Sequence, residues 1–129
     1  MPDCPFCNIK PERILREAAL TVSIWDAFPV SPGHALIVPR RHVVSWAEAT
    51  GEEKLDLLAA IDAVRDLIDQ LHHPDGCNVG FNDGPAAGHT VMHLHVHVIP
   101  RYQGDVPDPR GGVRWVLPHN ARYWDTDWK

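Results

Sequence analysis

The stretch His93-Leu94-His95-Val96-His97-Val98-Ile99 decides how this sequence folds. Histidines alternate strictly with apolar residues, and successive side chains of a β-strand point to opposite faces of a sheet. The pattern predicts a strand over 91–99, with three histidines on one face and Leu94, Val96 and Val98 on the buried face. The alternative is a strand whose solvent-exposed face merely carries histidine, and the strict alternation makes this the weaker interpretation.

The spacing of the three histidines limits what they can hold together. Residues two apart on a strand lie about 6.5 Å apart, and residues four apart lie about 13 Å apart. Zinc–nitrogen bonds are about 2.0–2.1 Å long, so one ion can hold two neighbours of the row but hardly all three. At least one histidine is left for other chemistry, and a neutral imidazole is a nucleophile or base near pH 7. A central His95 flanked by His93 and His97 suits attack on phosphorus.

The rest of the sequence predicts further strands around one long helix. Alternating and β-branched residues indicate strands over 21–25, 34–38 and 78–81, and the charged segment 12–17 indicates a turn of helix. Pro39 and Pro100 are expected to stop the strands that precede them. This order of elements predicts an α+β fold: an antiparallel sheet of about five strands, one long helix and a short N-terminal helix.

The long helix has the clearest local signals. Thr50-Gly51-Glu52-Glu53 is a capping-box pattern, with Thr50 as the N-cap and Glu53 reaching back to it. Apolar residues then follow at spacings of four, three, four and three, which form one helical stripe: Leu57, Ile61, Val64, Ile68 and Leu71.

Length and composition indicate one soluble globular domain over 1–129, with an N-terminal arm over 1–19 and a C-terminal tail over 101–129. The chain has 129 residues, of which 44% are hydrophobic and 22% charged. Its net charge of −5 argues against a protein that grips nucleic acid. No signal peptide or membrane-spanning segment is visible, so a cytoplasmic protein without a membrane partner is expected. Three cysteines make a disulfide scaffold unexpected.

The motifs together resemble the histidine triad (HIT) family, whose signature is His-x-His-x-His followed by two apolar residues. The resemblance extends over nearly the whole chain. It includes Trp25-Asp26, Ser31-Pro-Gly-His34-Ala-Leu-Ile-Val-Pro-Arg-Arg-His42 and Asn82-Asp-Gly-Pro-Ala-Ala-Gly88-His-Thr-Val. It implies a HIT-like fold, a homodimer and a nucleotide substrate whose nucleotidyl group is transferred or hydrolysed.

The resemblance also implies roles for individual residues. His95 would attack the α-phosphate and form a nucleotidyl-histidine intermediate, with its second ring nitrogen donating to a backbone carbonyl. His97 and backbone N–H groups around Gly88 and Thr90 would stabilise charge on the phosphate. Further matching positions are Asn82 for the phosphate or leaving group, Asp26 for the ribose hydroxyls and His34 beside the sugar. Asp26 as a simple turn residue and His34 as a satisfied strand-start histidine are the alternatives. Where the family commonly has Gln after Gly88, this chain has His89, which keeps a donor but leaves the leaving group open.

A structural zinc ion is the expected cofactor. Cys4-Pro-Phe-Cys7 is a Cys-x-x-Cys pair, and structural zinc takes four Cys or His ligands. The resemblance supplies His42 and His93 as the other two ligands, so His93 would belong to the metal site as well as to the triad. The alternative is a reduced thiol pair on a mobile arm. Cys77 is expected to be a buried thiol.

The expected function is hydrolysis of dinucleoside polyphosphates at the α-phosphate, with no metal in the chemical step. Alternatives are a nucleoside phosphoramidate hydrolase, a nucleotidyltransferase or phosphorylase, and a non-catalytic nucleotide-binding module. The tail segment Arg110-Gly-Gly-Val-Arg114 resembles a bacterial branch described as dinucleoside polyphosphate hydrolases. Arg101, Arg110 and Arg114 are therefore candidates for contacting a polyphosphate. The alternative is that they are surface charges, with Trp115, Trp124 and Trp128 as packing anchors.

Overall fold

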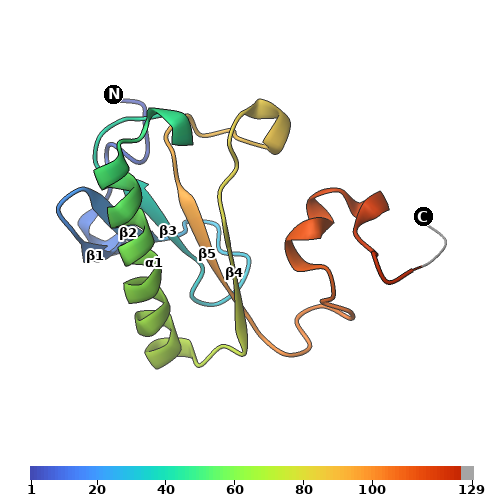
Figure 1. Cartoon of the computed structure of the whole chain (residues 1–129). Coiled ribbons are helices and arrows are strands. Elements are labelled where there is room, and N and C mark those ends of the chain that lie inside the picture. Colours follow the sequence, from blue (N-terminus) through green and yellow to red (C-terminus); the bar gives the residue numbers. More distant parts are fainter. Residues whose placement is uncertain (126–129) are drawn as a thin grey trace.

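A five-stranded antiparallel sheet forms the centre of the molecule (Figure 1). The computed structural model describes residues 1–125; Trp128 lies outside them. Strand order across the sheet is β1-β2-β3-β5-β4. The strands are β1 Ile14–Glu17, β2 Thr21–Trp25, β3 Ala35–Pro39, β4 Gly76–Gly80 and β5 Val96–Arg101. With the helix α1 over Gly51–His72, this confirms the predicted α+β class. Short 3-10 turns complete the described chain: Pro11–Arg13, Trp46–Glu48, Pro85–Ala87, Gly112–Val116 and Pro118–Asn120.

The two faces of the sheet are covered differently. Helix α1 packs on one face through Leu57, Val64 and Ile68, and the apolar side chains of β5 point toward it. The opposite face has a second cluster in which Phe6 of the N-terminal arm joins Val22, Ile24, Leu36 and Val38. The histidine face of β5 lies on this second face, because His97 pairs with Leu36 in the ladder. The arm therefore covers the sheet next to the histidines.

Helix α1 begins with the predicted capping box. The N–H of Glu53 donates to Thr50 Oγ1 at 3.0 Å, and the N–H of Thr50 donates to Glu53 Oε1 at 2.9 Å. Arg41 also contacts Glu53 at 2.8 Å, and this hydrogen bond is the main reason that the pKa of the Glu53 carboxyl is lowered. Leu71, expected on the buried stripe, is 59% exposed. No helix in residues 1–125 has the length and hydropathy needed to cross a membrane.

Replacing Thr50 with alanine should lower the free energy of unfolding by about 1 kcal/mol, since it removes the acceptor for the Glu53 N–H. Urea unfolding followed by far-UV circular dichroism measures this change. Glu52→Ala is the matched control, because Glu52 lies in the same first turn, exposed and outside the box. The capping interpretation is wrong if both variants lose the same stability.

Three expectations about local structure need correction. The helical turn expected over 12–17 starts one residue earlier and is shorter: it is the 3-10 turn Pro11–Arg13, and β1 follows because Ile14–Glu17 pairs with β2. Strand β5 starts at Val96 rather than near residue 91, because the chain bends where the N–H of His93 bonds the carbonyl of Val91. Pro39 is the last residue of β3, as expected, whereas Pro100 lies inside β5, which extends one residue further to Arg101.

The alternation itself is present in spite of the late strand start. Leu94, Val96 and Val98 are all buried in the cluster under α1. His95 and His97 point the other way, with ring centroids 5.2 Å apart. His93 comes before the strand and is fully buried. The three histidines therefore do not share one environment: His93 faces one group of side chains, and His95 and His97 face another.

The tail leaves the sheet at the end of β5 and forms 3-10 turns beside β4, on the far side of that strand from α1 (Figure 1). It is fixed to the body at several points. Arg101 forms a bidentate ion pair with Asp105, in which Nε lies 2.7 Å from Oδ2 and Nη2 lies 2.9 Å from Oδ1. The Tyr102 hydroxyl donates to the carbonyl of Pro32 at 2.6 Å.

Candidate functional site

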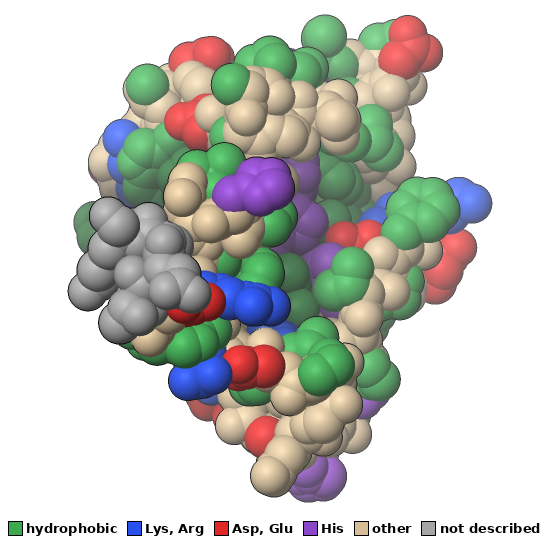
Figure 2. Space-filling model, turned by 90° about the vertical axis from the view of Figure 1, so that its right-hand side faces the viewer, with side chains coloured by type: hydrophobic (Ala, Val, Ile, Leu, Met, Phe, Trp, Pro, Cys, Tyr) green, Lys and Arg blue, Asp and Glu red, His purple; other side chains and the backbone are tan. Residues whose placement is uncertain are grey.

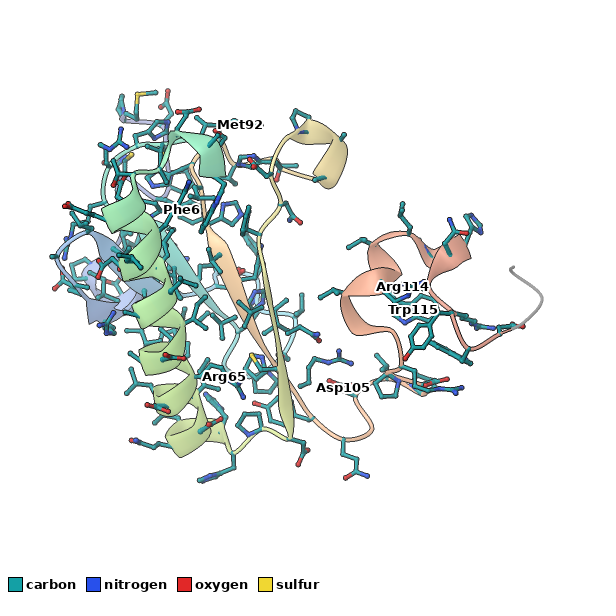
Figure 3. All side chains as sticks on the ribbon, viewed as in Figure 1. Phe6, Arg65, Met92, Asp105, Arg114 and Trp115 are labelled. Carbon is teal, nitrogen blue, oxygen red and sulfur yellow. The ribbon has the colours of Figure 1, made fainter. Side chains whose placement is uncertain are left out.

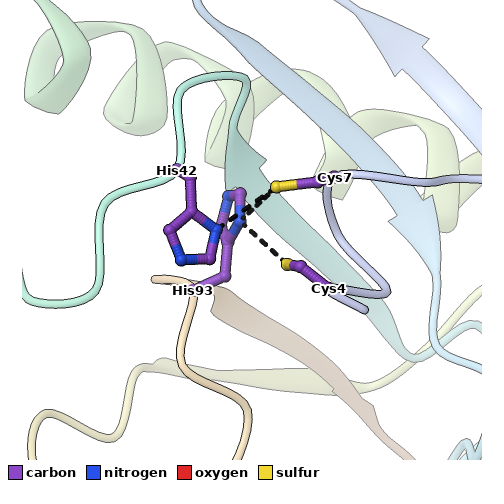
Figure 4. A group of neighbouring side chains, drawn as sticks. All are labelled: Cys4, Cys7, His42 and His93. Carbon is purple, nitrogen blue, oxygen red and sulfur yellow. Dashed lines mark hydrogen bonds between the residues drawn. The ribbon is translucent and has the colours of Figure 1, made fainter. Parts of the chain in front are cut away.

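Four potential metal ligands meet where the N-terminal arm contacts the start of β5 (Figure 4). The ligand atoms of Cys4, Cys7, His42 and His93 all lie within 4.8 Å of one another. His93 Nδ1 lies 3.4 Å from Cys4 Sγ and 3.6 Å from Cys7 Sγ, and His42 Nδ1 lies 3.2 Å from Cys7 Sγ. A tetrahedral zinc ion with bonds of about 2.0–2.3 Å separates its ligand atoms by about 3.3–3.8 Å, so this donor set fits that ion.

The tautomer of His93 also fits a metal ligand. Its Nε2 lies 2.8 Å from the carbonyl oxygen of Pro39, which can only accept a hydrogen bond. The proton is therefore on Nε2, and Nδ1 has a free lone pair directed at the two thiols. A backbone acceptor that orients a ligating histidine in this way is typical of metal sites.

His95 has the opposite arrangement, which leaves its other nitrogen unprotonated. Its Nδ1 lies 2.8 Å from the carbonyl oxygen of His93, so Nδ1 carries the proton and donates it. Nε2 is then a free lone pair. Phe6 packs against this ring with centroids 5.0 Å apart, and against the His93 ring at 5.9 Å. The arm that carries the two cysteines therefore also forms a wall beside His95.

A chain of hydrogen bonds fixes the tautomer of His97. The N–H of Val30 donates to His34 Nδ1 at 3.1 Å, so the His34 proton is on Nε2. That nitrogen lies 2.9 Å from His97 Nδ1 and 3.3 Å from Asp26 Oδ2, and it donates to them. His97 Nδ1 is therefore an acceptor and its proton is on Nε2. His95 and His97, side by side, present one lone pair and one N–H.

Burial keeps these imidazoles neutral. It lowers the pKa of His34, His93 and His95 below the ordinary value of 6.5, and it is the largest cause for each. The pKa of His97 falls furthest, to about 4, through burial and then through the neighbouring His95 and His34. A protonated imidazole has no acceptor nitrogen, so the lone pair on His95 and the acceptor nitrogen on His97 exist only while both rings are neutral.

The lowered pKa of His97 predicts a loss of stability in mild acid. The unfolded chain binds a proton at this residue near pH 6.5, whereas the folded chain binds it only near pH 4. The unfolded state is therefore favoured progressively as the pH falls from 6.5 to 4, and the contribution of neutral His97 is complete only above that window. Urea unfolding from pH 7 to pH 4 should show a steeper loss of stability for the wild type than for His97→Gln. Equal slopes would contradict the assignment.

The other residues expected at the site lie around these rings to different degrees. Asn82, His34 and His97 line one cavity. The N–H of Gly88 is already bonded to the Pro85 carbonyl at 3.0 Å, so it is engaged within its own turn. Thr90 is exposed and lines a different cavity with His42 and the first residues of the arm.

His89 takes a position that the sequence pattern did not specify in detail. The N–H of Gly84 donates to its Nδ1 at 3.2 Å, so its proton is on Nε2. The ring is 4% exposed and lies 6.0 Å from the His95 ring, and its Nε2 has no hydrogen-bond partner in the described chain. A buried N–H without a partner next to His95 is a donor available to a ligand.

Some features of the site were not expected from the sequence. The role of Phe6 as a wall was missed, although its place between the two cysteines was a usable signal. Asp26 accepts the N–H of Phe28 at 2.7 Å as well as the His34 proton, so it organises both the turn and the histidine chain. Cys77 is half-buried in β4 rather than fully buried, and burial raises the pKa of its thiol.

The tail arginines have partners within the chain. Arg101 contacts Asp105 and Asn78, and Arg110 contacts Asp108 at 3.0 Å. Arg114 donates to the carbonyls of Asn120 and Ala121. Of the expected aromatic anchors, Trp115 donates to the Arg110 carbonyl at 2.8 Å and Trp124 stacks under Arg110. These contacts favour the alternative in which the arginines are surface charges and Trp115 and Trp124 are packing anchors.

Among known proteins, this chain is similar to enzymes named for dinucleoside polyphosphates. It is 33% identical over 93 residues to a Schizosaccharomyces pombe protein named bis(5'-nucleosyl)-tetraphosphatase (asymmetrical), covering 72% of this chain and 51% of that protein. It is 32% identical over 98 residues to the Arabidopsis thaliana bifunctional bis(5'-adenosyl)-triphosphatase/adenylylsulfatase FHIT, covering 76% and 54%. The chain thus spans about half the length of these curated relatives.

Solved structures and a family model agree with this similarity. A zinc-bound histidine triad family protein from Mycobacterium smegmatis superimposes with a TM-score of 0.73 at 31% identity, covering 89% of this chain and 91% of that one. The family model described as the HIT domain matches residues 8–104, which include the arm after the cysteines, the sheet, α1 and all three histidines of the row. The chain therefore belongs to the HIT domain family.

Proposed function

We propose that this protein hydrolyses dinucleoside polyphosphates at the α-phosphate through a nucleotidyl-His95 intermediate. One observation carries the proposal: His95 offers a lone pair on Nε2 and its neighbour His97 offers an N–H on Nε2, each fixed by a hydrogen bond on the opposite ring nitrogen. A phosphoryl group needs both a nucleophile and a donor at this separation. The names of the curated relatives support the substrate class.

The proposed reaction has two displacements at one phosphorus. In the first, the His95 Nε2 lone pair forms a bond to the α-phosphorus, and the bond to the bridging oxygen breaks with its electron pair leaving on the polyphosphate. The His97 N–H donates to the oxygen where negative charge develops. In the second, water attacks the same phosphorus and releases a proton to solvent. The P–N bond breaks with its electron pair returning to His95 Nε2, and the nucleoside monophosphate leaves with the water oxygen. Neither displacement uses a metal ion.

Other residues are proposed to hold the substrate around this centre. Asn82 and the unpaired N–H of His89 would donate to phosphate oxygens, with backbone near Gly88 and Thr90 completing the loop. Asp26 would accept ribose hydroxyls through the remaining lone pairs of its carboxylate, and His34 would fix the tautomer of His97. The base would lie against the apolar second face of the sheet.

The products and their isotope content test this function. Incubated with diadenosine tetraphosphate in ¹⁸O-labelled water, the protein should release AMP and ATP, with the label in AMP alone. Adenosine 5′-phosphoramidate, offered in parallel, distinguishes a phosphoramidate hydrolase. Two ADP molecules as products, or label in ATP, would contradict attack at the α-phosphate, and turnover of the phosphoramidate alone would contradict the substrate class.

We propose that the cluster of Cys4, Cys7, His42 and His93 holds a structural zinc ion. The donor types, their spacing and the His93 tautomer support it, as does the zinc-bound solved relative. Zinc would fix the arm against the start of β5. The His93 carbonyl would in turn stay in place to hold the His95 Nδ1 proton.

We further propose a homodimer in the cytoplasm that acts on small nucleotides rather than nucleic acid. Strand β4 is at an edge of the sheet, and the outer side of α1 exposes Leu55, Leu58 and Leu71, which are surfaces a second copy would cover. Free thiols at Cys4, Cys7 and Cys77 support a reducing compartment. The net charge of −5 supports a small ligand.

A further inference from the structure

The proton on His97 is set from outside the reacting pair, by the loop over 27–33 that precedes β3. His97 offers its Nε2 N–H only because His34 donates to its Nδ1 at 2.9 Å. His34 can donate there only because its own Nδ1 accepts the N–H of Val30 at 3.1 Å. All three residues line one cavity of about 390 Å³. Figure 2 shows histidine side chains in a hollow on the face that carries the tail.

Loss of the Val30 contact would allow both protons to change places. If His34 held its proton on Nδ1, its Nε2 would be an acceptor, and His97 would have to donate to it from Nδ1. His97 Nε2 would then carry a lone pair and could no longer stabilise negative charge on a phosphate oxygen. Asp26, whose Oδ2 lies 3.3 Å from His34 Nε2, also favours the present arrangement, so the loss would be partial.

Little apolar packing holds the loop over 27–33 in place. Phe28 and Val30 are 87% and 72% exposed, and Pro29 and Pro32 are exposed as well. A segment that buries so little apolar surface gains little stability from the hydrophobic effect. The position of the Val30 N–H therefore depends on polar contacts of the loop rather than on buried side chains.

Two hydroxyl groups anchor this loop to the end of β5. Ser31 Oγ donates to the Pro100 carbonyl at 2.7 Å, and the Tyr102 hydroxyl donates to the Pro32 carbonyl at 2.6 Å. Next to them Gly33 has a φ of +88°, and a Cβ there would lie 3.3 Å from the Pro100 side chain, so the loop backbone lies close to β5. The anchored residues lie directly between the N–H that donates and the histidine that accepts it.

Tyr102 is itself fixed at the point where the tail leaves β5. Its N–H donates to Asp105 Oδ2 at 3.1 Å, and Arg101 holds the same carboxylate. The N–H of Gln103 donates to Asp75 at 2.8 Å, which joins this junction to the turn before β4. Figure 3 shows Asp105 where the tail leaves the sheet. The Tyr102 hydroxyl therefore reaches the loop from a backbone that is held at several points.

We propose that Tyr102 and Ser31 are positioning residues for the reaction. Their hydroxyls hold the loop over 27–33 so that the Val30 N–H keeps the proton of His97 on Nε2. The inference rests on the proposed function, because it takes that N–H as the donor to the phosphate. Both residues act through His34, so their removal slows the chemical step and leaves substrate binding nearly unchanged.

The test removes one oxygen atom from each anchor. The double variant Tyr102→Phe/Ser31→Ala is compared with Tyr123→Phe/Ser45→Ala, which makes the same two changes outside the loop, at an exposed tail tyrosine and at a serine that donates to Glu48. With diadenosine tetraphosphate, the anchor variant should lower kcat about tenfold, the order of effect that the loss of one hydrogen bond produces, and change KM less than twofold. The control variant should change neither.

A second readout observes the protons directly. Long-range ¹H–¹⁵N correlation spectra of protein labelled with ¹⁵N-histidine show which ring nitrogen is protonated, and the His97 signals are assigned by their absence in His97→Gln. The wild type should have this proton on Nε2. In the anchor variant both His97 nitrogens should shift toward the values of the other tautomer, whereas the control variant should match the wild type. A merely structural role of the two hydroxyls would lower Tm without moving these signals.

The outcomes that overturn the proposal are distinct from failure of the proposed function. A fall in kcat with unmoved His97 signals would overturn it, as would a rise in KM at unchanged kcat or equal effects of the anchor and control variants. A wild type with the His97 proton on Nδ1 would do the same. If the wild type does not turn over the dinucleotide, the spectra alone decide: shifted nitrogens in the anchor variant support the positioning role, and unmoved nitrogens overturn it. Should the double variant not fold, the single variant Tyr102→Phe is put through the same comparison with Tyr123→Phe.

Discussion

Replacing His95 with alanine should lower kcat for diadenosine tetraphosphate by about 10⁴-fold or more, because it removes the nucleophile and with it the covalent route. The geometry is the reason for so large an effect. His95 is the histidine whose Nε2 is left bare by a bond from Nδ1 to a carbonyl, whereas the His97 and His89 rings present N–H groups toward the site. Neither neighbour can take over attack without exchanging its proton and breaking its present hydrogen bond.

Two measurements separate loss of the nucleophile from general damage. Acid-quenched reactions with substrate labelled on the α-phosphate should give labelled wild-type protein and no labelled His95→Ala protein. His119→Ala is the matched control, since it removes an exposed tail histidine that does not line the cavity of His34, His97 and Asn82, and its kcat should stay within twofold of the wild type. Labelled protein from the His95 variant, or a loss of only about tenfold, would transfer the nucleophilic role to another residue.

Local signals explain which parts of the fold the sequence predicted well. The capping box at Thr50 depends on residues three apart, and the alternation from His93 to Val98 depends on neighbours, so both were readable directly. Strand β1 was not, because Ile14–Glu17 becomes a strand only by pairing with β2. The late start of β5 at Val96 depends on a bend at Val91 and on the Val43 carbonyl, to which the N–H of Leu94 donates.

The candidate site shows the same division between pattern and placement. Residue types and a family resemblance identified the histidines, and the resemblance implied that His95 donates to a carbonyl. They did not indicate which nitrogen carries the proton in the other rings. Those protons are set by carbonyls and amides from distant segments, such as Pro39 for His93 and Val30 for His34.

Loss of the metal is expected to have the largest effect on stability. Cys4→Ser should reduce bound zinc from about one ion per chain to a small fraction and lower the free energy of unfolding by about 3 kcal/mol, a shift on the order of 10 °C in Tm. The structural reason is that the arm is held over the second face of the sheet by Phe6 and Ile9 and by the metal ligands. Metal analysis by mass spectrometry and thermal unfolding measure the two effects.

Cys77→Ser is the control for this variant, because it removes a half-buried thiol in β4 far from the arm in sequence and outside the ligand cluster. It should keep its zinc. Activity provides a third readout, since His93 supplies both a metal ligand and the carbonyl that holds the His95 proton. Loosening the arm by Cys4→Ser should therefore also lower kcat, whereas Cys77→Ser should not. A wild-type protein purified without metal, or a Cys4→Ser protein with wild-type zinc content, would show that the four ligands form a thiol and imidazole cluster with no structural ion.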